Sequence, residues 1–411
     1  MRGGRPHLAF AGLAGTALAA LTGLVAGCRA SGPLPASRGI PPAAPAALGF
    51  DSTRLTAAVS FLKAEADSGA VPGAVLAVGR HGRLALAAAV GHYGVDDPRP
   101  VEVGTIYDLA SLTKVVGLTT ACMILVDEGK LALDAPVRRY LPEFRGAGKD
   151  QVAIRHLLTH SSGLPAWRQL YAEADSRATA LWIVNTTPLD TPPGKTYVYS
   201  DLGAIVLTEV VERITGGSLD AFLDARVFRP LRMPATRFLP PESWRDRIAP
   251  TENDTSFRHR MLRGEVHDEN AGRLGGVSGH AGLFSNALDL SRFAAMLLNG
   301  GSWDTLQLVR SETVAEFTRR QDLPPGSTRA LGWDTAPQPP DSTSSAGTKL
   351  SPRAFGHTGF TGTSLWMDPE KDLFIVLLTN RVHPTRANRA ILKLRPRVAD
   401  LVVDALRHPE L

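Results

Sequence analysis

The order of strand and helix patterns along the chain is the feature that most limits its possible folds. Five β-type runs are predicted, two near the start and three near the end: residues 71–78, 84–90, 354–357, 363–367 and 373–379. The region from about 115 to 270 has mainly helical periodicity. This order predicts an α/β (α+β) fold, in which the C-terminal strands complete an antiparallel sheet flanked by helices, with a mostly helical region inserted.

The segment Ser111-Leu112-Thr113-Lys114 opens a helical pattern that ends at Gly129. A serine at the start of a helix lies near unpaired backbone N–H groups and the positive end of the helix dipole, which favour developing negative charge. Lys114 lies one turn further along the same face, close enough to take a proton from the Ser111 hydroxyl. Because a serine hydroxyl is a weak nucleophile until a neighbouring base accepts its proton, the pair is a candidate for nucleophilic catalysis.

The tetrad alone is weak evidence, because Ser-x-x-Lys is common and a second copy occurs at Ser60–Lys63. That copy falls within a helix that is expected to begin near Asp51, so Ser60 lacks the free amides of a helix start. The case for catalysis therefore depends on partners elsewhere in the chain.

Composition and charge exclude several classes of function. The chain of 411 residues has 44% hydrophobic and 21% charged residues, which is typical of a globular protein. Its 45 basic and 40 acidic residues give a net charge of only +5 and are mostly scattered, so we expect no nucleic-acid partner. Two cysteines cannot form a disulfide framework, and no Cys/His spacing is typical of zinc.

The N-terminal residues have the pattern of a targeting segment. Arg2 and Arg5 precede an apolar run that ends in small residues, as in a secretory signal. The sequence Val25-Ala26-Gly27-Cys28 resembles a bacterial lipobox, in which the cysteine is lipidated and becomes the mature N-terminus. The alternative is a transmembrane anchor, since the apolar run is about 19 residues long. The expected division has three parts: a lipoprotein signal peptide at 1–27, a flexible tether at 28–48 and one folded domain at 49–411.

Two further motifs lie far along the chain from Ser111. Tyr199-Ser200-Asp201 stands in a loop just before a helical pattern, where one interpretation of Asp201 is a helix N-cap. Phe355-Gly356-His357-Thr358-Gly359 leads from one predicted strand towards the next, and its glycines let another backbone approach closely. A bulged β-turn with an incidental histidine is the alternative interpretation of this motif.

Taken together, Ser111-x-x-Lys114, Tyr199-x-Asp201 and His357-x-Gly359 resemble the ordered motifs of the serine β-lactamase and penicillin-binding protein family. The chain is most similar to the class C-like branch, with its carboxypeptidase and esterase relatives. Three more segments also resemble the family: residues 156–164, 279–285 and 379–381. The resemblance covers roughly residues 50–405 and implies a β-lactamase/transpeptidase-like fold with no cofactor and no metal.

The resemblance implies a role for each motif residue. Ser111 is the expected nucleophile, Lys114 its partner in proton transfer, and Tyr199 a second proton-transfer residue. The backbone N–H groups of Ser111 and Phe360 match an oxyanion hole, where fixed donors meet charge as it develops. Asp201 is expected to hold Lys114 in place. The remaining site residues are expected to bind or orient the substrate: His357, Thr358 and Gly359.

Two residues depart from the pattern of the family's lactamases, which usually carry Asn where Asp201 stands and Lys where His357 stands. Each change makes the site more negative by up to one unit. A unit charge about 5 Å away, at an effective dielectric constant near 20, contributes about 3 kcal/mol. Substrates with a free carboxylate are therefore expected to bind less well unless an arginine compensates, for which Arg273 and Arg381 are candidates.

The sequence thus predicts a serine hydrolase that forms an acyl-enzyme on Ser111. Its expected substrates are small molecules or peptidoglycan peptides with an amide or ester bond, including β-lactams and D-Ala-D-Ala peptides. A lipid anchor on Cys28 would hold it to a membrane in the periplasmic or extracytoplasmic part of the cell envelope. The alternative is a non-catalytic peptidoglycan-binding lipoprotein on the same fold. One further polar cluster is expected to serve in capping and loop hydrogen bonds, and a metal site is the alternative interpretation. Its members are His267, Asp268, Asn270 and His280.

Overall fold

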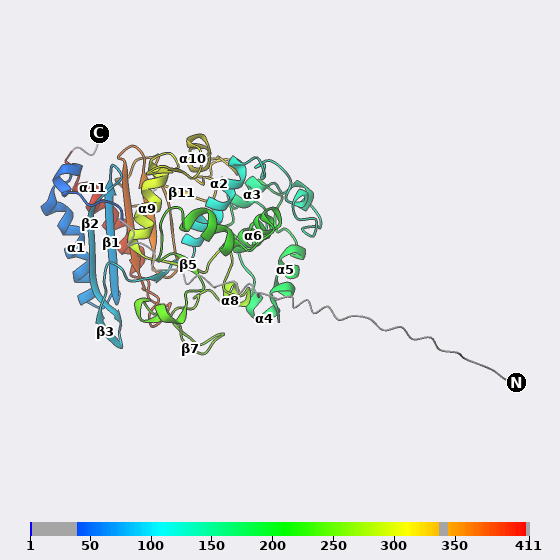
Figure 1. The fold of residues 1–411 in the computed structure, drawn as a ribbon, viewed down its shortest axis with the longest axis horizontal. Coiled ribbons are helices and arrows are strands. Elements are labelled where there is room, and N and C mark those ends of the chain that lie inside the picture. Colours follow the sequence, from blue (N-terminus) through cyan, green and yellow to red (C-terminus); the bar gives the residue numbers. More distant parts are fainter. Residues whose placement is uncertain (2–38, 337–343, 408–411) are drawn as a thin grey trace, which may run out of the picture. The chain divides into compact units, whose positions relative to one another are not determined.

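Strands from the two ends of the chain lie side by side in one seven-stranded antiparallel sheet, as the sequence predicted (Figure 1). The computed structural model describes residue 1 and residues 39–336 and 344–407. The strand order is β11-β12-β13-β14-β1-β2-β3. Their bounds are as follows: β1 Gly73–Arg80, β2 Arg83–Gly94, β3 Asp97–Pro100, β11 Asp334–Thr335, β12 Phe355–Thr358, β13 Ser364–Asp368 and β14 Leu373–Thr379.

The N-terminal and C-terminal strands are joined by the pairing of β1 with β14, in which Ala77 lies opposite Val376. Every residue of β14 is buried. Side chains along a strand point alternately to opposite faces, so Val376 joins the core on one face and its neighbour Leu377 joins the core on the other. The uninterrupted apolar sequence of β14 follows from this, because both faces of the strand are covered.

Helices cover the two faces of the sheet (Figure 1). Helix α1 (Ser52–Asp67) and helix α11 (Ile391–Asp404) pack on the face that carries Leu377, and helix α9 (Ala287–Leu298) packs on the face that carries Val376. Asp51 caps α1, because its carboxylate accepts a hydrogen bond from the Arg54 N–H at 3.0 Å.

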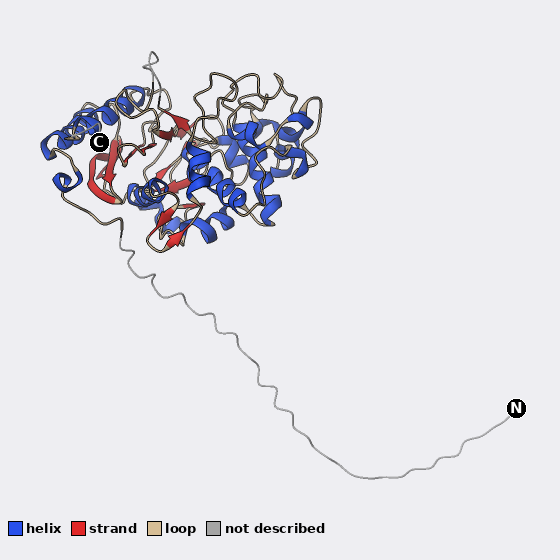
Figure 2. Cartoon of the chain, turned by 90° about the horizontal axis from the view of Figure 1, so that it is seen from above, coloured by secondary structure: helices blue, strands red, loops and turns tan. Residues whose placement is uncertain are grey.

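The helical part of the chain lies beside the sheet, as Figure 2 shows. Its helices have these bounds: α2 Thr120–Asp127, α3 Ile154–Leu158, α4 Leu170–Glu173, α5 Arg177–Thr186, α6 Asp201–Thr215, α7 Leu219–Leu223, α8 Glu269–Arg273 and, later in the chain, α10 Ser311–Thr318. Two π-helical segments are Lys114–Thr119 and Asp224–Phe228, and four 3₁₀ segments are Pro45–Leu48, Val137–Arg139, Lys149–Gln151 and Glu242–Arg247.

Short strands form three smaller sheets outside the main one. The three-stranded sheet is β4 (Tyr107–Asp108), β8 (Leu283–Ser285) and β5 (Arg237–Phe238). The two hairpins are β6 (Asn253–Asp254) with β7 (Arg260–Met261), and β9 (Ser302–Trp303) with β10 (Leu306–Gln307). The pairing of β4 with β8 matters for function, because β4 leads directly into Ser111.

The folded unit begins before residue 49, since Ile40 and Leu48 are both buried within it. The end of the predicted tether is therefore packed against the domain. The predicted signal peptide, the lipobox and Cys28 lie outside the described residues. Within residues 39–336 and 344–407, no helix combines the length and apolar character that a membrane span requires.

Candidate active site

Ser111 follows a tight turn at the end of β4. Ala110 has a φ of +47°, a left-handed conformation that is unfavourable for a residue with a side chain. The Asp108 carboxylate holds this turn by accepting hydrogen bonds from the N–H groups of Ala110 at 2.8 Å and His267 at 2.6 Å. The chain then enters the π-helix Lys114–Thr119 rather than a regular α-helix. Ser111 thus stands at a helix start, as predicted, on a strained turn.

Lys114 lies directly behind Ser111 and is buried. Its Nζ lies 3.2 Å from Ser111 Oγ, 3.0 Å from the His280 carbonyl oxygen and 2.6 Å from Asp201 Oδ1. The ammonium group donates hydrogen bonds to the Ser111 hydroxyl and the His280 carbonyl and forms an ion pair with Asp201. Burial disfavours the charged form, but Asp201 and then Tyr199 outweigh it, so the pKa of Lys114 is raised above its ordinary value. Lys114 is therefore an ammonium at neutral pH, and must lose a proton before it can accept that of Ser111.

Asp201 is not the cap of α6, so the N-cap interpretation of this residue is wrong. Ser200 caps the helix instead, because its hydroxyl accepts a hydrogen bond from the Gly203 N–H at 3.1 Å. Asp201 is the first helical residue, and its carboxylate is left for Lys114. The sequence-based expectation that Asp201 lies against Lys114 agrees with this arrangement.

Tyr199 lies in a stack of aromatic rings above Lys114. Its ring centroid is 4.6 Å from that of His160 and 5.8 Å from that of His357, and the Lys114 Nζ is 5.0 Å from it. Burial, with the charges of Arg329 and Lys114, lowers the pKa of both histidines well below the ordinary value. His160 and His357 are therefore neutral at physiological pH.

The turn that follows β12 is fastened to the segment that precedes Ser111. Thr361 Oγ1 donates to the Asp108 carbonyl at 2.7 Å, and Thr363 Oγ1 donates to the Leu109 carbonyl at 3.0 Å. Gly359 packs so closely that a Cβ atom there would lie 2.2 Å from the Leu109 carbonyl oxygen. These contacts bring Phe360 beside Ser111.

The residues predicted from the three motifs meet at one cavity of about 680 Å³. Six of them line it: Ser111, Tyr199, His357, Thr358, Gly359 and Phe360. Lys114 and Asp201 lie immediately behind Ser111. The structure therefore brings together every predicted site residue except Cys28, which lies outside the described residues.

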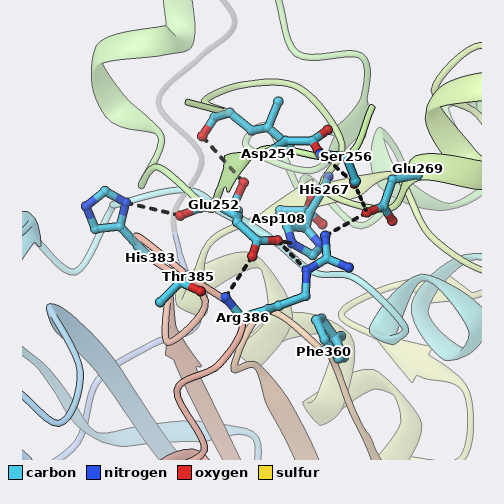
Figure 3. A network of polar contacts seen from close by, with 12 residues as sticks. Asp108, Glu252, Asp254, Ser256, His267, Glu269, Phe360, His383, Thr385 and Arg386 are labelled. Atoms are coloured by element: carbon cyan, nitrogen blue, oxygen red, sulfur yellow. Dashed lines mark hydrogen bonds and ion pairs between the residues drawn. The ribbon is translucent and has the colours of Figure 1, made fainter. Parts of the chain in front are cut away.

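The side chain of Phe360 rests on a polar network (Figure 3). Its ring stacks on His267, with centroids 5.6 Å apart. The His267 Nε2 lies 2.8 Å from Glu252, and Arg386 forms ion pairs of 2.6 Å with both Glu252 and Glu269. The exposed Phe360 side chain is thus packed against a group of paired charges.

The polar cluster considered for a metal divides into separate pairs. His267 contacts Glu252, whereas His280 Nε2 lies 2.9 Å from Asp268. Asn270 instead bonds the backbone of the segment that contains α4. Among the described residues, no group of three or more His, Cys, Asp or Glu side chains is arranged to hold a metal ion. Loop hydrogen bonds and helix capping account for these contacts.

The cavity is also rich in arginine, which the sequence analysis missed almost completely. Five arginines line it: Arg329, Arg381, Arg386, Arg389 and Arg395. Asp334 is the one acidic residue among the cavity-lining residues that the structure describes. Arg381 was a candidate from sequence, whereas Arg273 bonds the Tyr171 carbonyl and does not line the cavity. The one available signal was the closeness of four arginines between positions 381 and 395.

Comparison with known proteins agrees with this geometry. The sequence model of the Beta-lactamase family matches residues 58–398. A relative from Salmonella agona (strain SL483), named "Putative D-alanyl-D-alanine carboxypeptidase", is 33% identical over 84% of this chain and 87% of its own.

Two solved structures share the fold. The hydrolase EstCE1, described as having promiscuous acyltransferase activity, superimposes with a TM-score of 0.68 at 23% identity, covering 85% of this chain and 98% of that one. A class C β-lactamase from Rhodobacter sphaeroides gives 0.65 at 22% identity, covering 85% and 99%.

We expect Asp201→Asn to lower the pKa of Lys114, because the amide keeps a hydrogen-bond acceptor but removes the negative charge that stabilises the ammonium. The Lys114 group should then titrate at a lower pH than in the unsubstituted protein. NMR of ¹⁵N-lysine-labelled protein follows the titration, with the signal assigned by its loss in Lys114→Met. Asp334→Asn is the matched control, since Asp334 lines the same cavity without contacting Lys114. An unchanged Lys114 titration in Asp201→Asn would contradict the interpretation.

Proposed function

The chain belongs to the β-lactamase family and is a serine hydrolase of the β-lactamase, D,D-carboxypeptidase and esterase type, and from this premise we propose that it cleaves D-Ala-D-Ala-type peptides through an acyl-enzyme on Ser111. The observation that carries the proposal is the arginine-lined cavity above Ser111 and Lys114. The family assignment favours this enzyme over the non-catalytic binding lipoprotein.

The proposed acylation begins with attack of Ser111 Oγ on the peptide carbonyl carbon. In the proposed step Tyr199 acts in its phenolate form and takes the Ser111 proton to become a neutral phenol, while the Lys114 ammonium donates a hydrogen bond to Oγ throughout. Lys114 and Arg329, 5.0 Å and 6.0 Å from the Tyr199 ring centroid, offset negative charge on the phenolic oxygen. Tyr199 then gives the proton to the departing amine of the terminal D-alanine, which leaves the acyl group on Ser111.

In the proposed deacylation, water takes the place of Ser111 as the nucleophile and Ser111 becomes the leaving group. Tyr199 takes a proton from water, the resulting hydroxide attacks the acyl carbonyl, and the proton returns to Ser111 Oγ as the ester bond breaks. In both steps the carbonyl oxygen becomes negatively charged. The backbone N–H groups of Ser111 and Phe360 are the proposed donors that stabilise it.

The choice of an anionic substrate rests on charge. The pKa of Arg381 is lowered, chiefly by burial and also by the neighbouring Arg386 and Arg389, although Glu252 opposes this shift. Clustered cations of this kind are stabilised by a bound anion, and the terminal carboxylate of a D-Ala-D-Ala peptide supplies one. The sequence-based concern was that Asp201 and His357 weaken carboxylate binding unless an arginine compensates. The exposed cavity arginine Arg389, whose side chain has no ion pair or hydrogen bond among the described residues, supports such compensation.

We propose in addition that the mature protein is held in the cell envelope by a lipid on Cys28, on the periplasmic or extracytoplasmic side. The lipobox Val25-Ala26-Gly27-Cys28 after a charged start and an apolar run supports this. The location suits the proposed substrate, since peptidoglycan peptides lie outside the cytoplasmic membrane.

The test of the catalytic proposal is covalent labelling combined with product release. We expect a fluorophosphonate to label Ser111 in the full-length protein, and an acyl-D-Ala-D-Ala peptide to release D-alanine. Ser111→Ala should abolish both, because the nucleophile is absent. Ser60→Ala, which alters the second Ser-x-x-Lys copy on the exposed side of α1, should retain both. Labelling or release that survives in Ser111→Ala would refute the assignment, and cleavage of p-nitrophenyl esters alone would favour an esterase.

The arginines predict a preference for a free carboxylate. We expect kcat/KM for a D-Ala-D-Ala peptide to exceed that for the same peptide with a C-terminal amide by about 100-fold, given about 3 kcal/mol for a unit charge about 5 Å away. Added salt should narrow the difference, because it screens the partly exposed charges. A neutral p-nitrophenyl ester serves as the salt-insensitive control. Equal kcat/KM for acid and amide would contradict the role of the arginines.

Lipidation is tested with Cys28→Ser. Radiolabelled palmitate supplied to cells that express the unsubstituted chain should be incorporated, whereas the serine variant should remain unlabelled because no thiol is present to be acylated. Membrane fractionation should then show release of the variant. Cys122→Ser is the control, since Cys122 is buried in the domain and should leave labelling unchanged. Equal palmitate incorporation in Cys28→Ser would exclude this anchor.

A further inference from the structure

Arg395 reaches from helix α11 into the underside of the turn that carries Phe360. It is a buried arginine, and its Nη2 donates to the carbonyl oxygens of Gly359 at 2.5 Å and Thr363 at 2.7 Å. A second arginine acts on the same turn, because Arg381 Nε donates to the Phe360 carbonyl at 2.8 Å. Two cationic side chains thus bind successive carbonyl groups of one turn.

The bond to Gly359 fixes the direction of the next N–H group. The peptide between Gly359 and Phe360 is planar and trans, so its C=O and its N–H point in opposite directions. The carbonyl of Gly359 points inward, where it also accepts the Gly362 N–H at 3.0 Å. The N–H of Phe360 must therefore point away from Arg395. Phe360 and Ser111 line the same cavity.

We infer that Arg395 is a positioning residue for the oxyanion hole, which orients the Phe360 N–H by holding the Gly359 carbonyl on the opposite side of the peptide. The inference rests on the proposed function, because it assumes that the Phe360 N–H meets the developing oxyanion. Charge-assisted bonds to carbonyl oxygens are among the stronger hydrogen bonds, and a fixed donor needs no reorganisation during the reaction.

The arrangement is costly, which argues that it has more than a packing role. Burial, with Arg381 nearby, lowers the pKa of Arg395. Its Nε has no hydrogen-bond partner among the described residues. An apolar side chain at this position of α11 would avoid the cost of burying a cation. What an apolar side chain cannot supply is a pair of donors for the Gly359 and Thr363 carbonyls.

The test compares Arg395→Met and Arg395→Lys with the unsubstituted full-length protein. For Arg395→Met we expect kcat to fall by about 10- to 100-fold with little change in KM. Removal of one oxyanion-hole donor lowers kcat by about 100- to 1000-fold, and a donor that is only misoriented should cost less. The fall should be equal for a neutral p-nitrophenyl ester and an acyl-D-Ala-D-Ala peptide. Arg395→Lys keeps a cation and N–H donors and should recover part of the loss. Hydrogen exchange of residues 359–363 should become faster in Arg395→Met.

The matched control is Arg292→Met on α9. Arg292 is equally buried and donates to the Leu231 carbonyl at 3.1 Å, but it does not line the Ser111 cavity. It should lose thermal stability without the change in kcat. If Arg395→Met does not fold, Arg395→Lys decides the question with the same two substrates.

Two results would overturn the inference. An unchanged kcat in folded Arg395 variants would show that the Phe360 N–H keeps its direction without Arg395. A rise in KM for the anionic peptide alone, with the ester unaffected, would make Arg395 a substrate-binding group instead. Failure of the proposed function is distinct from both, because the unsubstituted protein and Ser111→Ala would then hydrolyse the substrates equally.

Discussion

The pairing of β1 with β14 is the constraint on which the site depends. It joins strands from the two ends of the chain in the centre of the sheet, with both faces of β14 buried. Because β13 pairs with β14 and β12 with β13, the turn that carries Phe360 is placed at the edge of the Ser111 segment. Thr361 and Thr363 then fasten the two segments through backbone carbonyls. The turn and the segment that leads to the nucleophile, 253 positions apart at Asp108 and Thr361, become neighbours.

Charge balance explains the chemistry behind Ser111. A buried lysine ordinarily loses its proton more easily, yet Lys114 is paired with Asp201 and has its pKa raised. Lys114 also donates to the His280 carbonyl, and the His280 ring contacts Asp268. A second carboxylate is thus connected to Lys114 through His280. The resting site therefore holds Lys114 as a charged donor to Ser111, and this leaves Tyr199 as the proposed proton acceptor.

The sequence predicted the strands and the motif residues well, because their signals are local. Alternating and continuous apolar runs specify strands, and each motif places its residues within a few positions. The cap of α6 was assigned to Asp201 rather than Ser200, since both residue types are good caps and only the tertiary contact with Lys114 separates them. Four cavity arginines were missed because only the tertiary fold brings them to the cavity that holds Ser111. Arg395, for example, lies among helical residues and acts on a turn 36 positions earlier.

The five cavity arginines do not have equal freedom to meet a substrate. Arg381 and Arg395 bind carbonyls of the Phe360 turn, and Arg386 is neutralised by Glu252 and Glu269. Arg329 lies 3.5 Å from Asp334 and bonds the Gly332 carbonyl. Arg389 is exposed, and within the described residues its side chain has no ion pair or hydrogen bond. For the proposed carboxylate-bearing substrate, Arg389 is therefore the cavity arginine at which no existing bond must be broken, while the buried Arg381 and Arg395 hold the turn that carries Phe360.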